Sequence, residues 1–188
     1  SEPGGATPVN LDALSRQYLG WSQPQYPADN TLASFPAALS GPTAPVMLMK
    51  PATSTSEYWL VENRPPTGWD AGMYRWLSPW IGGLLIQHVD LNVGSKGLNN
   101  FNAYYTGPHQ GVMVVEPASA TCSIKTVGTP TVGCQTLLYY SGNATLFSSA
   151  SNPTSAYYSG TLSGVSVSSV SSPSSTMTAI VSQGGGNV

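Results

Sequence analysis

Charged side chains are scarce in this sequence. Asp, Glu, Lys and Arg make up 7% of the 188 residues, whereas they make up about a quarter of a typical soluble domain. The last of them is Lys125, and the rest of the chain is built mainly from Ser, Thr, Gly, Tyr and Val. A net charge of -2 leaves no basic stripe, and phosphate-driven binding of nucleic acid needs one. Neither nucleic acid nor an anionic membrane surface is therefore expected as a partner.

Long apolar runs are also missing. The longest, Trp80 to Ile86, is interrupted by Gly82 and Gly83 and is far shorter than the roughly 20 residues that span a bilayer. We predict no membrane span. The first residues, SEPGGATP, have neither a cationic start nor an apolar stretch, so an export signal, if the protein had one, has been removed or lies on a longer precursor.

Cysteine is represented by two residues, Cys122 and Cys134, which flank a Gly/Pro/Thr-rich loop. Their spacing does not match that of a zinc, redox or haem site. We predict a structural disulfide, worth about 3 kcal/mol for a loop of this size, with two buried free thiols as the alternative. A disulfide would place the protein in an oxidising compartment, outside the cell or at its surface.

One helix is predicted near the start of the chain. Thr7 would be its N-cap, Pro8 its first residue and Gly20 its C′ residue, as the preferences at helix ends suggest. Leu11, Leu14 and Tyr18 would share the face that docks on the rest of the protein. The segment 24–42 that follows is predicted to be a loop with short apolar pieces.

The remaining predicted elements are strands. Their apolar and β-branched runs are bounded by Gly, Pro and Ser, and they cover residues 45–49, 58–62, 81–89, 112–116, 136–140, 144–147, 164–170 and 176–182. The first two are expected to pair as a hairpin. The Ser-rich segment after 164 could be a linker, but its valines alternate with serines, which favours a pair of strands.

These elements predict a mainly β fold: an antiparallel β-sandwich with one short N-terminal helix and long loops. Residues 1–120 would form the helix and a β-sheet region with long aromatic loops. Residues 121–188 would form a charge-free, Ser/Thr-rich β segment that completes or extends the sandwich.

Three residues could carry chemistry: His88, Asp90 and His109. His88 and Asp90 lie two apart on a predicted strand and therefore point to the same face. Imidazole and carboxylate are ligand types of zinc and iron sites, but no metal-site spacing is present. No G-x-S-x-G nucleophile turn occurs either. A hydrolase built around these residues is kept as an alternative, and no catalytic residue is assigned.

Calcium is the one cofactor that other residues could accommodate. Acids and amides offer oxygen ligands, but a D-x-D-x-D-G loop is missing, so no cofactor is expected. The residues considered are Glu57, Glu62, Asp70, Asp90, Glu116, Asn92, Asn99, Asn100 and Asn102.

Tryptophans in the first half of the chain could form a binding surface. An aromatic stripe can stack on sugars or peptides, although such residues more often cover a sheet. The candidates are Trp59, Trp69, Trp76 and Trp80.

Three stretches resemble, in the same order, the region that follows the catalytic motif in secreted zinc metallopeptidases of the immune inhibitor A family. They are TPVNLDALSRQYLGW, EYWLVENRPPTGWDAG leading to GGLLIQHVD, and YYSGTLSGVSVSSVSSPSSTMTAIVS. The matching residues are Leu11, Asp12, Ala13, Ser15, Leu19, Gly20, Trp21, Glu57, Tyr58, Glu62, Asn63, Arg64, Gly83, Leu84, Leu85, Ile86, His88, Val89 and Asp90.

The resemblance implies a β-rich module and makes His88 and Asp90 a family landmark instead of a catalytic pair. The family's zinc site is H-E-x-x-H on a helix, and this sequence contains no such motif. Gln87 also stands where relatives usually have Trp. We therefore predict a secreted, non-catalytic module that acts as a structural or assembly surface, with a protein partner or copies of itself. A carbohydrate- or peptide-binding module is the further alternative.

Overall fold

Two β-sheets and three short helical segments make up the described part of the chain. The computed structural model describes residues 9–37, 46–51, 56–75, 79–93, 110–121 and 135–184. Within these ranges, none of the helices is long and apolar enough to cross a bilayer. In chain order the elements are α1 (Ala13–Tyr18), β1 (Pro24–Gln25), β2 (Thr31–Pro36), β3 (Val46–Met49), β4 (Glu57–Arg64), η1 (Gly68–Arg75), β5 (Gly83–Asp90), β6 (Val112–Val114), η3 (Gln135–Leu137), β7 (Leu146–Phe147), β8 (Val165–Ser168) and β9 (Thr176–Gln183).

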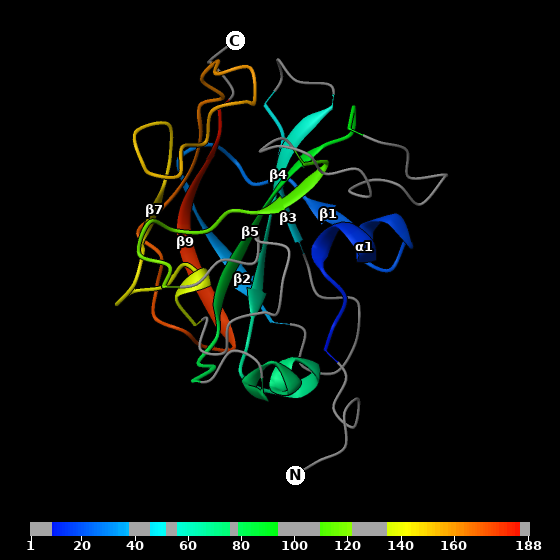
Figure 1. The fold of residues 1–188 in the computed structure, drawn as a ribbon, viewed down its shortest axis with the longest axis vertical. Helices are drawn as coiled ribbons and strands as arrows, with labels where there is room; N and C mark the ends of the chain where they lie inside the picture. Colours follow the sequence, from blue (N-terminus) through cyan, green and yellow to red (C-terminus); the bar gives the residue numbers. More distant parts are fainter. Residues whose placement is uncertain are drawn as a thin grey trace.

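The first sheet is built around one long antiparallel pair. Its strand order is β1-β3-β4-β5-β6, and β4 pairs with β5 from Glu57 opposite Asp90 to Arg64 opposite Gly83. β1 runs parallel to β3, and the other neighbours are antiparallel. Almost every side chain of β4 and β5 is buried, because other elements cover both faces of this sheet (Figure 1).

The second sheet has one covered face and one open face. Its strand order is β2-β9-β8-β7, antiparallel throughout. Met177, Ala179 and Val181 of β9 are fully buried, whereas Ile180 between them is 39% exposed. This period of two is the pattern of a half-buried strand, and the alternating Val and Ser of β8 produce it in the same way.

The main core lies between the two sheets. Trp59 and Ile86 of the first sheet join Phe35 and Val167 of the second in one apolar cluster. The side-chain amide of Asn63 links the sheets by donating a 2.8 Å hydrogen bond to the backbone oxygen of Phe35. The two sheets form a β-sandwich, so the predicted mainly β fold is confirmed.

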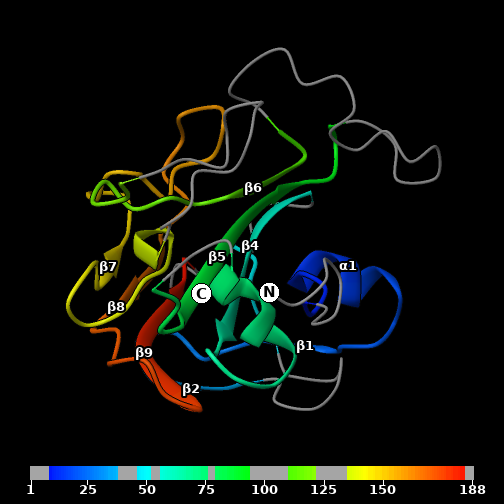
Figure 2. The ribbon, with the colours of Figure 1, turned by 60° about the horizontal axis from the view of Figure 1, so that its bottom comes forward.

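A second, smaller core holds α1 on the outer face of the first sheet. Ala13 and Leu14 of the helix pack against a patch of that face. The molecule is therefore layered, with α1, the first sheet and the second sheet in that order (Figures 1 and 2). The residues of the sheet that contact the helix in this core are Leu48, Tyr58, Leu60 and Val89.

Most predicted strands are present. The ranges 45–49, 58–62, 81–89, 112–116, 144–147, 164–170 and 176–182 overlap β3, β4, β5, β6, β7, β8 and β9, and both predicted pairings, β3 with β4 and β8 with β9, are confirmed. The strand predicted over 136–140 is reduced to a single bridge, in which Tyr139 pairs antiparallel with Leu84 of β5. Gln135–Leu137 before it form a 3-10 turn, in which the Gln135 side-chain amide bonds the backbone of Ile81 and Gly82.

The sequence predicts that the segment 24–42 is a loop with short apolar pieces. The structure instead has two strands in it, β1 and β2, and β2 pairs with β9 along its whole length. β2 belongs to the first 120 residues of the chain but forms the edge of the sheet whose other strands follow residue 121. The division at residue 120 therefore does not coincide with a boundary between the sheets.

Helix α1 begins later than its sequence predicts. Asp12, not Thr7, is the N-cap, and its carboxylate accepts a 3.0 Å hydrogen bond from the backbone N–H of Ser15. The predicted end is correct, because Gly20 adopts a φ of 72° just after the helix. The predicted docking face is wrong in part: Leu14 is buried, but Tyr18 is 61% exposed.

Candidate functional site

A buried cluster of four charged residues joins α1, β4 and η1. The Arg16 guanidinium pairs with the Glu62 carboxylate, and the Arg64 guanidinium lies 2.8 Å from Asp70 Oδ1 and 3.4 Å from Glu62 Oε1. All four residues are at most 6% exposed. Charges this deep are stable only when paired, so the cluster fixes the relative positions of the three elements.

Glu62 of this cluster and Gln87 of β5 accept hydrogen bonds from free N–H groups at the start of α1. Glu62 Oε1 accepts a 3.2 Å bond from the Ala13 N–H, and Gln87 Oε1 accepts a 3.3 Å bond from the Leu14 N–H. The first N–H groups of a helix have no partner within the helix. Here the first sheet provides the partners, which explains why so short a helix is retained.

Asp70 is a carboxyl of this cluster whose pKa is raised. Burial raises the pKa of its carboxyl from 3.8 to about 6, although the Arg64 guanidinium and the Asn10 N–H both act in the opposite direction. Removal from water thus outweighs the attraction of the nearby cation. Strongly shifted groups also occur in active sites, but the Asp70 carboxylate accepts hydrogen bonds from the Asn10 N–H and the Arg64 guanidinium, both part of the protein's own scaffold.

His88 lies in a stack of three rings. Its imidazole is 4.6 Å from the Trp59 ring, at an interplanar angle of 14°, and 4.3 Å from the Tyr158 ring, at 17°. Nε2 lies 2.8 Å from Glu57 Oε1. Because a carboxylate can only accept, Nε2 carries the proton in this bond. His88 is 5% exposed, so its ring acts as packing material between β4 and the loop before β8.

Asp90 occupies the end of β5, on the same face as His88 by strand geometry. Its Oδ1 accepts a 2.9 Å hydrogen bond from the backbone N–H of Asn92, and Glu57 lies opposite it in the ladder. His109 lies outside the described residues. Of the predicted group of His88, Asp90 and His109, the structure therefore describes His88 and Asp90. His88 bonds the Glu57 carboxylate and Asp90 bonds the Asn92 backbone.

The acids considered for calcium lie in different places. Glu62 and Asp70 pair with arginines on the outer face of the first sheet, while Glu57 bonds His88 on the inner face. Among the described residues, no group of three or more His, Cys, Asp or Glu side chains is placed to hold a metal ion. Asn99, Asn100 and Asn102 lie outside them.

Two of the four candidate tryptophans cannot form a binding surface. Trp59 is fully buried between the sheets, and Trp80 is 4% exposed, with its indole N–H bonded to the backbone oxygen of Pro65. Trp69 is 46% exposed on η1, and Trp76 lies outside the described residues. Burying a large apolar ring is worth roughly 2 to 3 kcal/mol, which explains why the core takes up these aromatics.

Cys122 and Cys134 lie outside the described residues, but their neighbours are informative. Thr121, next to Cys122, donates its backbone N–H to Thr136 Oγ1 at 2.9 Å, and the two threonine hydroxyls are 3.0 Å apart. Thr136 is two residues after Cys134. The chain thus enters and leaves the intervening loop at neighbouring points.

Sequence reasoning missed the open face of the second sheet as a candidate site. Leu32 on β2 lies opposite Ile180 on β9, Ile180 opposite Ser168 on β8, and Ser168 opposite Leu146 on β7. Leu32 is 70% exposed and Leu146 48% exposed. Exposed apolar side chains of β2, β9 and β7 therefore lie along one line across the sheet, with Ser168 of β8 between Ile180 and Leu146. The alternation in TMTAIVS signals the Ile180 position, whereas Leu32 lies in a segment predicted to be a loop.

The other strand residues on the exposed face of the second sheet are mostly Ser and Thr and carry no charge. We call this exposed face, including its apolar residues, the open sheet face. Asp29 lies at its border, where its carboxylate accepts hydrogen bonds from the Ser182 hydroxyl and the Gln183 backbone. Its members, read from the alternation of the strands, are Leu32, Ser34, Leu146, Ser166, Ser168, Thr176, Thr178, Ile180 and Ser182.

Comparison of the chain with protein-family models, with curated proteins and with solved structures finds no match.

Proposed function

We propose that this chain is a non-catalytic β-sandwich module, derived from a secreted metallopeptidase-like protein, that serves as an assembly surface by associating with copies of itself. The observation that carries the proposal is the open sheet face. It combines the exposed side chains of Leu32, Ile180 and Leu146 with Ser and Thr side chains on the strands, and the Asp29 carboxylate lies at its border, bonded to Ser182 and Gln183. Exposed apolar surface on a sheet is a feature of interaction sites.

The absence of charge from this face favours a second copy as the partner. When two copies meet through the same face, each side chain approaches its own counterpart or a near neighbour, so like charges would repel. Ser and Thr hydroxyls both donate and accept hydrogen bonds, so a hydroxyl of one copy can bond the same hydroxyl of a second copy. The open sheet face can therefore meet an identical surface without electrostatic cost.

The non-catalytic part of the proposal is supported by the bonds of the landmark residues. The first two sequence stretches that resemble metallopeptidases contribute α1, β4 and β5, and their polar residues bond one another across these elements. Gln87, which stands where relatives usually have Trp, accepts from the Leu14 N–H and donates to Asp12. Bonds of this kind position elements of the fold, which supports a structural role for these residues.

Secretion and a location outside the cell or at its surface belong to the same proposal. They rest on the resemblance and on the predicted Cys122–Cys134 disulfide, which persists in oxidising compartments. The contact between Thr121 and Thr136 supports this pairing, since it brings together the ends of the loop that the two cysteines flank.

Multi-angle light scattering over a micromolar concentration series tests the proposal. The chain should form species whose mass grows with concentration, and Leu32→Asp should reduce that mass to one chain. Leu162→Asp is the matched control, because Leu162 is 68% exposed but lies on the loop before β8. A wild-type chain that stays monomeric throughout would overturn the proposal. If the chain then bound a separately produced peptidase domain, the face would dock there instead.

A further inference from the structure

β2 is a long, uncharged strand at the edge of the second sheet. It pairs with β9 over all six of its residues without a bulge, and in the part of the chain that the structure describes no strand lies on its other side. Proteins usually block such edges with charged residues, with a bulge or by keeping the edge strand very short. β7, at the opposite edge, is two residues long, whereas β2, with the sequence TLASFP, is neither short nor charged.

One hydrogen bond shows which backbone groups of β2 face away from β9. The N–H of Ala37, directly after β2, donates to the Ser175 oxygen at 2.9 Å. Hydrogen-bonded and non-hydrogen-bonded residues alternate along an antiparallel pair. Every second residue before Ala37 therefore bonds towards β9, back to Thr31, and the backbone groups of the residues in between point the other way. These residues are Leu32, Ser34 and Pro36.

The proline at position 36 agrees with this assignment. Proline has no N–H, so within a sheet it fits where the missing donor would have pointed away from the neighbouring strand. Leu32 and Ser34 keep their N–H groups. Within the described ranges, neither residue has a hydrogen-bond partner for its backbone N–H or C=O, and both are exposed, Leu32 to 70%. We call this row of backbone groups the β2 edge.

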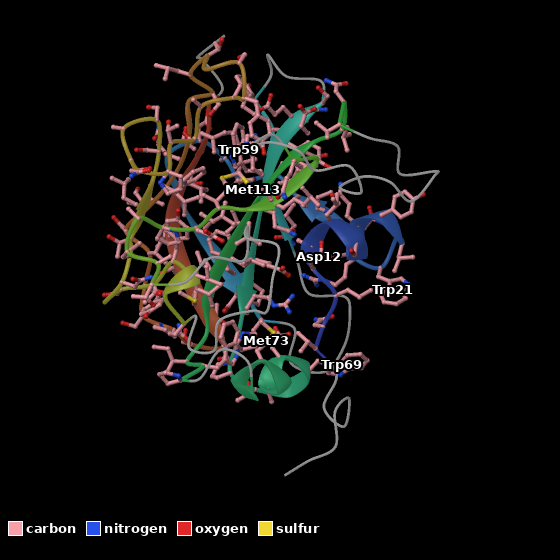
Figure 3. All side chains as sticks on the ribbon, viewed as in Figure 1. Asp12, Trp21, Trp59, Trp69, Met73 and Met113 are labelled. Atoms are coloured by element: carbon pink, nitrogen blue, oxygen red, sulfur yellow. The ribbon has the colours of Figure 1, made fainter. Side chains whose placement is uncertain are left out.

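The two sides of the β2 edge differ. On the inner side, Ala33 and Phe35 are at most 7% exposed and belong to the core cluster that contains Trp59, which lies among the strands in Figure 3. On the outer side, the Leu32 side chain is largely uncovered. A strand added here would thus meet a core that is already formed and would cover Leu32, provided that it placed an apolar side chain opposite.

We infer that the β2 edge is a strand-addition site, which binds an extended segment of a partner protein antiparallel to β2, with an apolar residue opposite Leu32. The hydrogen-bonding groups identify the occupant. N–H and C=O groups that recur at every second residue, about 7 Å apart, are matched by the main chain of another extended peptide. Leu32 and Ser34 can each exchange two bonds with the residue opposite, and Pro36 ends the ladder because it lacks a donor.

This inference goes beyond the proposed function and does not depend on it. The β2 edge bonds in the plane of the second sheet, whereas the open sheet face lies on the surface of that sheet. A chain that stays monomeric but binds a strand at the β2 edge would overturn the proposed function and keep the inference.

Amide hydrogen exchange, followed by NMR on the dilute monomer, tests the site. The probe is a synthetic peptide with the sequence of residues 176–181, TMTAIV, which pairs with β2 on its other side in the fold. Without peptide, the Leu32 and Ser34 amides should exchange fast and the Ala33 and Phe35 amides slowly. Millimolar peptide should slow the first two by about tenfold, the effect of one hydrogen bond. The same peptide methylated on every backbone nitrogen, which cannot donate, should have no effect.

Two substitutions at one position separate the backbone from the side chain. Ser34→Pro removes an outward N–H without disturbing the bonds to β9, as Pro36 does two residues later, and should weaken peptide binding about tenfold. Ser34→Ala keeps the N–H and should bind like the wild-type chain. Circular dichroism checks the fold of both variants. The methylated peptide decides the question if Ser34→Pro is unfolded, because that comparison leaves the protein unchanged.

Three results would overturn the inference. Leu32 and Ser34 amides that exchange as slowly as that of Ala33 in the dilute monomer would show that the chain itself covers the edge. Exchange that slows with rising protein concentration in the absence of peptide would make a second copy the occupant. Exchange that stays fast with the peptide, or slows equally with its methylated form, would show that no ladder forms there.

Discussion

Glu57 accepts a 2.7 Å hydrogen bond from the backbone N–H of Tyr158, 101 positions away in the chain. The same oxygen atom, Oε1, also bonds His88 Nε2 on the neighbouring strand. One carboxylate thus holds the loop before β8 against the first sheet and keeps the His88 ring aligned beneath Tyr158.

Replacing Glu57 should therefore destabilise the fold, and the loss should be smaller when the new side chain can still accept these hydrogen bonds. Glu57→Ala leaves two donors without their partner and should cost about 1 to 3 kcal/mol, measured by urea unfolding. Glu57→Gln keeps an accepting oxygen and should cost less. Equal losses for the two variants would show that the bonds to Oε1 do not hold the loop.

Glu62→Ala should be among the most damaging substitutions. It removes the partner of the buried Arg16 and one partner of Arg64, and an unpaired buried charge costs about 3 to 5 kcal/mol. Lys50→Ala is the control, because this charge is exposed and such changes stay within about 0.5 kcal/mol. Denaturant unfolding monitored by tryptophan fluorescence measures both. A loss below 1 kcal/mol for Glu62→Ala would contradict the structural role of the cluster.

Asp70 should make the protein less stable as the pH rises from about 4 to 6. Its pKa is about 6 in the fold and 3.8 ordinarily, so the folded state binds more protons in this window and stability falls through it. The total change is on the order of 3 kcal/mol, since one pKa unit corresponds to 1.36 kcal/mol.

Asp70→Asn isolates this contribution, because the amide keeps the shape and one accepting oxygen but does not titrate. Urea unfolding of both proteins at several pH values between 4 and 7 should show the wild-type chain losing stability relative to the variant as the pH increases. A constant difference between the two curves would mean that Asp70 is ionised throughout.

Gly184→Ala should destabilise the second sheet by more than backbone strain alone. A Cβ at Gly184 would lie 1.9 Å from the backbone oxygen of Ser163, at the point where β9 passes the start of β8. Gly20→Ala is a matched control, because Gly20 has the same φ of 72° but no atom within 4 Å of an added Cβ. The thermal midpoint of Gly184→Ala should fall further. Equal decreases would attribute both effects to φ.

The predicted disulfide can be tested by mass. The intact protein under non-reducing conditions should weigh two hydrogens less than the reduced protein, and reduction should lower the stability by about 3 kcal/mol. Two thiols that react with a thiol reagent in denaturant without prior reduction would show that Cys122 and Cys134 are free.

Some elements were predictable because their cause is local. The alternation of Val and Ser over 165–168 and the run TMTAIV each define one buried face, so β8 and β9 follow from period two alone. Gly20 ends α1 because few other residues adopt its φ. The long run through Ile86 predicts β5 because both faces of that strand are buried, leaving no polar interruption.

Other elements were not predictable because their cause lies elsewhere in the chain. α1 begins at Ala13 since Glu62 and Gln87, on two different strands, bond its first N–H groups. β2 has a weak pattern of its own, and it is a strand because β9 provides its ladder. The burial of Trp59 and Trp80, where the sequence suggested a binding surface, likewise depends on the sheet that packs above them.

The sequence by itself determined a mainly β chain with little charge and the residues that share one face of each alternating strand. Only the tertiary structure decided what these residues do: His88 lies between two rings, Glu62 and Asp70 pair with buried arginines, and Leu32, Ile180 and Leu146 are exposed on the outer face of the second sheet. The physical reason is that periodicity fixes which side of a strand a residue faces, whereas burial, ion pairing and exposure depend on which distant segment covers that side.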